Sequence, residues 1–140
     1  MKKYKIGYTT GVFDLFHIGH VNILKNAKEQ CEFLIVGITS DELCYARKNK
    51  SPVIKFNERV EILSAIRYVD QVVVQSDMNK LDAVKKYGVD VVFVGSDWQG
   101  SPEWITYEKQ FALVGCHVIY LPHTDGTSST MLKEVLGKYK

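Results

Sequence analysis

Five short apolar runs alternate with amphipathic stretches along this chain, and that alternation limits its fold more than any other feature. We predict strands at residues 5–10, 33–39, 71–75, 89–95 and 117–121, and helices at 18–30, 41–46, 57–68, 79–87, 103–113 and 128–139. Strands separated by helices pair in parallel, and right-handed crossovers then cover both faces of the sheet. We therefore expect an α/β fold: a single Rossmann-like domain over residues 1–140, with an open parallel sheet of about five strands.

The composition narrows the class of protein. A hydrophobic content of 46% is that of a soluble globular chain, and a net charge of +2 is too small to indicate a nucleic-acid binder. No apolar stretch approaches the roughly 20 residues of a membrane span, so we expect a cytoplasmic protein without membrane insertion. Cys31, Cys44 and Cys116 are odd in number and lack C-x-x-C spacing, which argues against a disulfide framework and a zinc ribbon.

The sequence GVFDLFHIGH at residues 11–20 places His17 and His20 three apart, directly after the first predicted strand. A strand that turns into a helix directs the helix's free N–H groups at an anion above the strand, and Gly19 allows close backbone approach. Imidazoles there stabilise the charge that grows on a breaking phosphate bridge. As zinc ligands the pair would need further partners, and none lies nearby, so we predict no metal site formed by the protein.

Three more segments stand out: IRYVD at 66–70, GSDW at 95–98 and TDGTSST at 124–130. Like the histidine turn, the last two follow predicted strands, and open parallel sheets bind ligands at the carboxyl ends of strands, so we expect the motifs to converge on one cleft. In the last segment, Ser128 is a natural helix N-cap and Gly126 accommodates a positive φ. Capping explains one hydroxyl but not five, so we predict a second phosphate-binding turn. Trp98 could line a ligand pocket or pack as cover over a local turn, and a large aromatic side chain suits both roles equally well.

These segments, in this order and spacing, resemble the cytidylyltransferases of the HIGH-motif nucleotidyltransferase superfamily, and most of all the bacterial glycerol-3-phosphate cytidylyltransferases. The likeness covers nearly the whole chain. It implies that an acceptor phosphate oxygen attacks the α-phosphorus of CTP in line and expels pyrophosphate, with no covalent enzyme intermediate. It also implies Mg²⁺ bound with the nucleotide, a small phosphorylated acceptor and a homodimer.

The resemblance assigns roles to individual residues. The implied catalytic residues are His17, His20, Lys48, Lys50 and Arg67. The implied nucleotide-binding residues are Thr10, Gly11, Val12, Phe13, Asp14, Gly19, Gly95, Asp97, Thr124, Gly126, Ser128, Ser129 and Thr130. The implied acceptor-binding residues are Asp14, Arg67, Trp98 and His123. Asp14 is further expected to hold the turn. Six basic residues lie in one region of the sequence: Arg47, Lys48, Lys50, Lys55, Arg59 and Arg67. We interpret this region as facing an anion, although such a run is also typical of a solvated loop.

The chain departs from the family pattern R-T-E-G-I-S-T-T at two positions. His123 stands where an arginine is usual, and Asp125 where a glutamate is usual. Imidazole offers fewer donors and only a conditional charge, and aspartate has a shorter reach. Both changes bear on the acceptor, so phosphocholine, phosphoethanolamine and sugar or polyol phosphates stay open beside glycerol 3-phosphate.

Three other functions stay open at this stage. One is adenylyl transfer from ATP, as in superfamily relatives that act on flavin or sugar phosphates. Another is a non-catalytic nucleotide-binding subunit, which the intact histidines and loop lysines disfavour. The third is a receiver-like or flavodoxin-like binding domain, which shares the layered architecture but gives no reason for the paired histidines.

Overall fold

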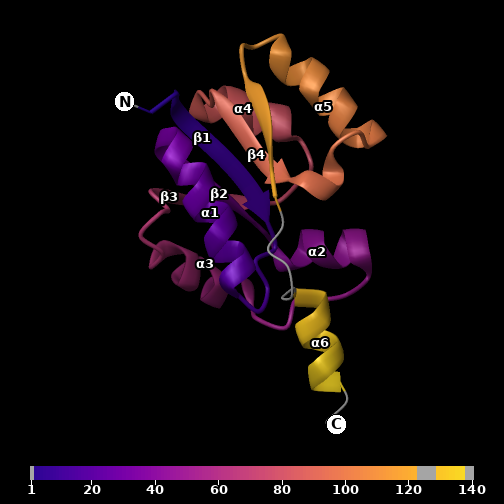
Figure 1. Cartoon of the computed structure of the whole chain (residues 1–140). Helices are drawn as coiled ribbons and strands as arrows, with labels where there is room; N and C mark the ends of the chain where they lie inside the picture. The colour runs from indigo at the N-terminus through magenta and orange to yellow at the C-terminus, as the bar shows by residue number, and fades with distance from the viewer. Residues whose placement is uncertain (1, 123–128, 138–140) are drawn as a thin grey trace.

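The computed structural model of the chain describes residues 2–122 and 129–137, including a five-stranded sheet and the helices around it (Figure 1). The strands are β1 (Tyr4–Gly11), β2 (Cys31–Thr39), β3 (Gln71–Gln75), β4 (Val91–Gly95) and β5 (His117–Leu121). The helices are α1 (Ile18–Gln30), α2 (Asp41–Lys48), α3 (Phe56–Ser64), α4 (Lys80–Tyr87), the 3₁₀ turn η1 (Ser96–Trp98), α5 (Pro102–Ala112) and α6 (Ser129–Gly137).

The sheet is entirely parallel, with strand order β3-β2-β1-β4-β5. The chain moves outward from β1 through β2 to β3, then crosses back to place β4 on the other side of β1. The strand order therefore reverses between β1 and β4, which is where open α/β sheets bind ligands at their carboxyl edge. The predicted α/β class and five-strand parallel sheet are confirmed.

Two apolar clusters lie on opposite faces of the sheet, as the alternation of side chains along a buried strand requires. Leu34 and Val36 of β2 belong to the cluster that includes residues of α1 and α3. Ile35, between them, belongs to the cluster that includes Trp104 and Phe111 of α5. Helices therefore cover both faces. No helix in the described part of the chain is long and apolar enough to cross a bilayer.

Local signals set the helix ends. The Ser40 hydroxyl accepts the N–H of Leu43 at the start of α2, and Asn49 ends that helix in the left-handed region at φ 56°. Gly88 ends α4 in the same way, at φ 64°. The helix predicted at 57–68 ends earlier, at Ser64, and the chain then turns into β3.

Candidate active site

The H-x-G-H turn fixes two imidazoles at the start of α1. His17 is the N-cap: its Nδ1 accepts the N–H of Gly19 at 3.0 Å. The N–H of His17 donates to Nδ1 of His20 at 3.1 Å, and the ring centroids lie 4.0 Å apart. Because both Nδ1 atoms accept hydrogen bonds, the proton of each neutral ring is on Nε2. The turn therefore presents two neighbouring Nε2–H donors.

Both imidazoles are neutral at pH 7. Burial, together with a smaller effect of the neighbouring His17 and against an opposing effect of Asp14, lowers the pKa of His20 to about 4. The rings of Phe13 and Phe16 lie 5.4 and 5.2 Å from the His20 ring and supply part of that burial. Burial also lowers the pKa of His17. Each ring of the unliganded protein therefore offers a neutral N–H donor instead of a positive charge.

The turn that leads to the histidines is strained and is held by Asp14. Phe13 and Leu15 have φ values of 54° and 50°, which are costly for side chains with a Cβ. Between them, the Asp14 carboxylate is only 3% exposed. It accepts the N–H groups of Val53 at 2.8 Å and Ile54 at 2.9 Å. Asp14 therefore fixes the turn to the loop between α2 and α3.

Asp14 also links the turn to the last helix, because Nζ of Lys133 in α6 lies 3.0 Å from its carboxylate. Burial opposes the charge on Asp14, but the N–H groups of Ile54 and Val53 together with Lys133 lower its pKa. The carboxylate is thus ionised and engaged in holding three segments together. This geometry agrees with a positioning role.

Arg59 is a second positioning residue, although the sequence groups it with the anion-facing cations. Its side chain is fully buried. It donates from Nε to the Ile54 carbonyl at 2.9 Å and from one terminal nitrogen to the carbonyls of Val12 and Thr39 at 2.8 Å. Its other terminal nitrogen lies 2.6 Å from the Asp41 carboxylate. Arg59 therefore joins the carboxyl ends of β1 and β2 to the loop, and the expectation that it faces an anion is corrected.

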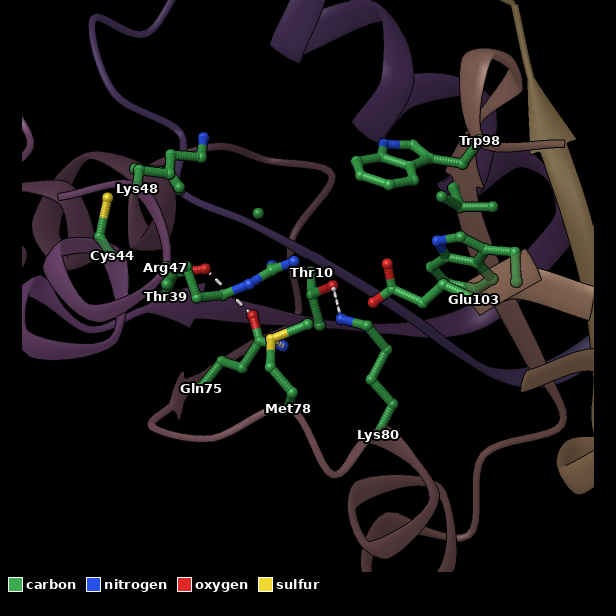
Figure 2. A pocket seen from close by; sticks show the side chains of 14 residues that line it. Thr10, Thr39, Cys44, Arg47, Lys48, Gln75, Met78, Lys80, Trp98 and Glu103 are labelled. Atoms are coloured by element: carbon green, nitrogen blue, oxygen red, sulfur yellow. Dashed lines mark hydrogen bonds between the residues drawn. The ribbon is translucent and has the colours of Figure 1, made fainter. Parts of the chain in front are cut away.

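A cavity of about 260 Å³ opens where the strand order reverses, at the carboxyl ends of β1, β2 and β4 (Figure 2). Its lining residues are Thr10, Gly11, Val12, Thr39, Cys44, Arg47, Lys48, Gln75, Met78, Lys80, Val94, Trp98, Glu103 and Trp104. Arg47, Lys48 and Lys80 make it cationic. We call it the strand-end cavity.

A second cavity of similar size lies next to it, on the histidine side, and we call it the histidine cavity. Its lining residues are Val12, Phe13, Asp14, His20, Cys44, Lys48, Lys50, Ser51, Pro52 and Lys133. The two cavities share Val12, Cys44 and Lys48. Lys48 is therefore placed to contact ligands in both, which suits a reaction between two bound polyanions.

Lys80 is the residue that sequence reasoning missed most clearly. It is 7% exposed, and its ammonium donates to the Thr10 hydroxyl at 2.8 Å. The rings of Trp104 and Tyr107 lie 5.9 and 6.0 Å from it. Burial lowers the pKa of Lys80 to about 8, against an opposing effect of Glu103. Within the described residues no ion pair joins Lys80 to a carboxylate, so this buried cation is suited to an anionic ligand.

No motif marks Lys80, Gln75, Met78, Glu103 or Trp104 in the sequence. The available signal was their position: Gln75 ends β3, Met78 and Lys80 follow it, and the two α5 residues follow β4. In a parallel sheet these places meet at one edge.

The structure gathers most of the predicted residues around the two cavities. The strand-end cavity contains Thr10, Gly11, Val12, Lys48 and Trp98; the histidine cavity contains Val12, Phe13, Asp14, His20, Lys48 and Lys50. Gly19 lies in the histidine turn. Gly95 ends β4 and Asp97 lies in η1, and neither is among the described lining residues. His123, Thr124, Gly126 and Ser128 lie outside the described residues; Ser129 and Thr130 begin α6, but their side chains also lie outside the description.

Arg67 is not brought to these cavities, which corrects its expected place. It is exposed and precedes β3, and its guanidinium donates to the Tyr68 hydroxyl at 3.2 Å. Asp70, three residues later, binds the backbone N–H of Leu34 early in β2. In a parallel sheet the start of one strand lies beside the start of its neighbour, so Arg67 lies at the amino edge, opposite the cavities.

Comparison with known proteins shows the family to which this chain belongs. The family model for cytidylyltransferase-like proteins matches residues 8–135. The chain belongs to the cytidylyltransferase-like family. The matched range of this cytidylyltransferase-like chain contains the histidine turn and every residue that lines the strand-end and histidine cavities.

Individual relatives of this cytidylyltransferase-like chain agree. It is 38% identical over 129 residues to the glycerol-3-phosphate cytidylyltransferase of Staphylococcus aureus, covering 91% of this chain and 92% of that protein. It is 39% identical over 114 residues to the FAD synthase of Pyrococcus horikoshii, covering 81% and 77%. Among solved structures, a lipopolysaccharide core biosynthesis protein from Thermoplasma volcanium superposes with a TM-score of 0.71 at 26% identity, covering 88% of this chain and 98% of that one.

Proposed function

We propose that this cytidylyltransferase-like enzyme transfers CMP from CTP to glycerol 3-phosphate and releases CDP-glycerol and pyrophosphate. The observation that carries the proposal is the position of His20, the partner of His17 in the histidine turn, on the wall of one of two adjacent cationic cavities that share Lys48. One cavity suits a triphosphate and the other a small phosphate. The similarity to glycerol-3-phosphate cytidylyltransferases along nine tenths of the chain supports the choice of both substrates.

The chemistry needs position and charge neutralisation more than acid–base catalysis. An oxygen of the acceptor's phosphate attacks the α-phosphorus of CTP, the bond from that phosphorus to the bridging oxygen breaks, and pyrophosphate leaves with the bond electrons. The phosphate monoester is ionised at pH 7 and needs no base. The Nε2–H groups of His17 and His20 donate to the oxygens between the α- and β-phosphates, where negative charge grows. Lys48 neutralises charge on both reactants.

Lys80 holds the acceptor in this scheme. A phosphate in the strand-end cavity supplies the anion that the buried ammonium lacks, and Arg47 adds a second cation to the lining of the same cavity. The Trp98 ring, 43% exposed, is available to cover the carbon chain of the acceptor. Mg²⁺ arrives as part of the nucleotide substrate, bound by phosphate oxygens and water, the arrangement that this ion favours.

Adenylyl transfer from ATP is the second candidate. The observation that favours it is the 39% identity to an FAD synthase over most of the chain. Both candidates use the same phosphate chemistry, so the nucleotide base and the acceptor distinguish them.

A pyrophosphate-release assay with Mg²⁺ tests the proposal. CTP and ATP are each combined with glycerol 3-phosphate, phosphocholine, phosphoethanolamine, flavin mononucleotide and a set of sugar phosphates. We expect release with CTP and glycerol 3-phosphate. Pyrophosphate release that requires ATP and flavin mononucleotide supports the second candidate. No release with any pair supports a non-catalytic nucleotide-binding role.

We further propose a cytoplasmic homodimer. Exposed apolar side chains at Tyr45, Val53, Ile62 and Val74 support self-association, and Val74 lies on the edge strand β3. The three free, buried cysteines support a reducing compartment. Sedimentation velocity across a concentration series tests the dimer, and a sedimenting monomer at every concentration contradicts it.

A further inference from the structure

Glu103 is the one carboxylate among the described residues that line the strand-end cavity. It lies in the first turn of α5, a helix that begins at Pro102 with Ser101 as its N-cap. An acidic residue in the first turn is also favoured by the helix dipole, which accounts for its residue type. The dipole does not account for its direction: Figure 2 shows the carboxylate turned into the cavity, toward the ammonium of Lys80.

The carboxylate acts on Lys80 without forming an ion pair with it. The charge of Glu103 raises the pKa of Lys80 against the larger effect of burial. Within the described residues no salt bridge includes Glu103. Burial and then the charge of Glu103 raise the pKa of Tyr107, whose hydroxyl donates to the carbonyl of Met78 at 3.0 Å. A carboxylate has about four acceptor positions, so Glu103 retains capacity for a ligand.

The charges around Glu103 favour a neutral donor as its ligand partner. Arg47, Lys48 and Lys80 line the same cavity, so a cationic group on the ligand would meet three like charges and one opposite charge. A hydroxyl donates to a carboxylate without that repulsion. Met78 and Trp98, which line the same cavity, suit the carbon atoms between the ligand's polar groups.

We propose that Glu103 accepts a hydrogen bond from a hydroxyl of the acceptor and so selects a polyol phosphate over a phosphorylated amine. The inference rests on the proposed function, because it assigns the acceptor to the strand-end cavity. The acceptor's phosphate binds Lys80 and its hydroxyl binds Glu103. Since these two groups face each other across one small cavity, phosphate and hydroxyl are only a few bonds apart in the preferred acceptor.

The test is a comparison of acceptors across variants. The wild type, Glu103→Gln and Glu103→Ala are assayed with CTP and four acceptors: glycerol 3-phosphate, 1,3-propanediol monophosphate, 1,2-propanediol 1-phosphate and phosphoethanolamine. The two propanediol phosphates each lack one hydroxyl of glycerol 3-phosphate. The matched control is Glu108→Gln, which changes an exposed carboxylate on the same helix. Thermal unfolding midpoints confirm that each variant is folded.

We expect Glu103→Ala to lower kcat/KM for glycerol 3-phosphate by about 10- to 100-fold, the loss that follows removal of a hydrogen bond to a charged group. For the propanediol phosphate that lacks the bound hydroxyl, the loss shrinks to about threefold or less. The KM for CTP stays unchanged, Glu108→Gln matches the wild type, and phosphoethanolamine is a poor acceptor throughout. Calorimetric binding of glycerol 3-phosphate weakens in parallel.

Two results overturn the inference while the proposed function stands: equal losses for all four acceptors, which indicate that Glu103 acts only through the charge of Lys80, or no loss for any. A wild type that prefers phosphoethanolamine overturns it as well. Turnover with another polyol phosphate, lost in Glu103→Ala, contradicts glycerol 3-phosphate as the substrate but keeps Glu103 in its role. A wild type that releases no pyrophosphate with any polyol phosphate contradicts both the role of Glu103 and the proposed function.

Discussion

The backbone N–H of His17 donates to Nδ1 of His20, so the first histidine of the motif orients the second. His17 is oriented in turn by the N–H of Gly19. Both contacts use groups at the start of α1 that would otherwise lack partners. The helix therefore sets the ring orientation and tautomer before substrate arrives, which is the condition for electrostatic preorganisation.

His17 has two separable roles, as helix cap and as donor to phosphate. His17→Asn keeps a capping oxygen but removes the imidazole donor, whereas His17→Ala removes both. We expect both variants to lose turnover by about 100- to 1,000-fold. Only His17→Ala should lower the free energy of unfolding, by about 1 kcal/mol. Steady-state kinetics and urea unfolding measure the two effects, and near-normal turnover in His17→Asn contradicts the mechanism.

His20 makes the protein sensitive to mild acid. Its folded-state pKa of about 4 lies below the ordinary value of 6.5, so between these values the unfolded state binds more protons. Stability should therefore fall as pH drops from about 6.5 to 4, by a few kcal/mol from this residue. Urea unfolding of the wild type and His20→Asn at pH 7 and 4.5 tests this. A difference between the two proteins that does not change with pH contradicts the assignment.

Lys80 sets an alkaline limit on acceptor binding. Its ammonium is charged at pH 7 and loses its proton near pH 8, well below the ordinary value of 10.5. We expect kcat/KM for glycerol 3-phosphate to fall as pH rises through about 8, because this parameter reports the free enzyme. Lys80→Met should lower it about 100-fold at pH 7 and remove that pH dependence. An alkaline limb that survives in Lys80→Met belongs to another group.

The strand and helix order was predictable from sequence because the apolar runs and amphipathic stretches alternate cleanly. β3 and β5 occupy the predicted residues. The end of α3 was misplaced for a physical reason: Ile66 and Val69 continue a helical apolar pattern, yet they pack on the core from the turn that follows Ser64. Periodicity records burial, and turn residues can be buried too.

Site residues were predictable where they directly follow one of the first two strands. They were not predictable where they belong to crossover segments that are distant in the sequence and meet only in the folded chain. His17, His20 and Lys48 follow β1 and β2 closely and were found. Lys80 and Glu103 belong to later crossovers, and only the reversal of strand order brings them together. A single sequence carries the order of elements but not which strand becomes the neighbour of β1.

Arg59 and Arg67 make a matched pair that separates burial from charge. Arg59 is fully buried and donates to three backbone carbonyls, whereas Arg67 is exposed at the amino edge. We expect Arg59→Ala to cost about 3–5 kcal/mol of stability, because carbonyls and Asp41 lose their partner. Arg67→Ala should stay within about 0.5 kcal/mol. Guanidinium chloride unfolding measures both.

Enzyme activity gives a second test of the place of Arg67. Arg67→Ala should keep its KM for CTP and for the acceptor if the cavities of one chain form the whole site. A large rise in either KM would instead restore Arg67 to a site role, for which a second copy of the chain would have to bring it to the carboxyl edge.

Lys133 ties α6 to the histidine turn, and its loss should affect nucleotide binding more than folding. The side chain is 44% exposed, so its pair with Asp14 contributes only about 0–1 kcal/mol to stability. It also lines the histidine cavity, where a triphosphate would compete with Asp14 for the ammonium. We expect Lys133→Ala to raise the KM for CTP about 5- to 20-fold with little change in unfolding. Asp14→Asn should instead lower stability by about 1–3 kcal/mol, because one carboxylate oxygen becomes an NH2 group and one of the N–H groups of Val53 and Ile54 loses its acceptor. Equal effects of both variants on unfolding, with an unchanged KM in Lys133→Ala, would show that the ion pair serves the fold alone.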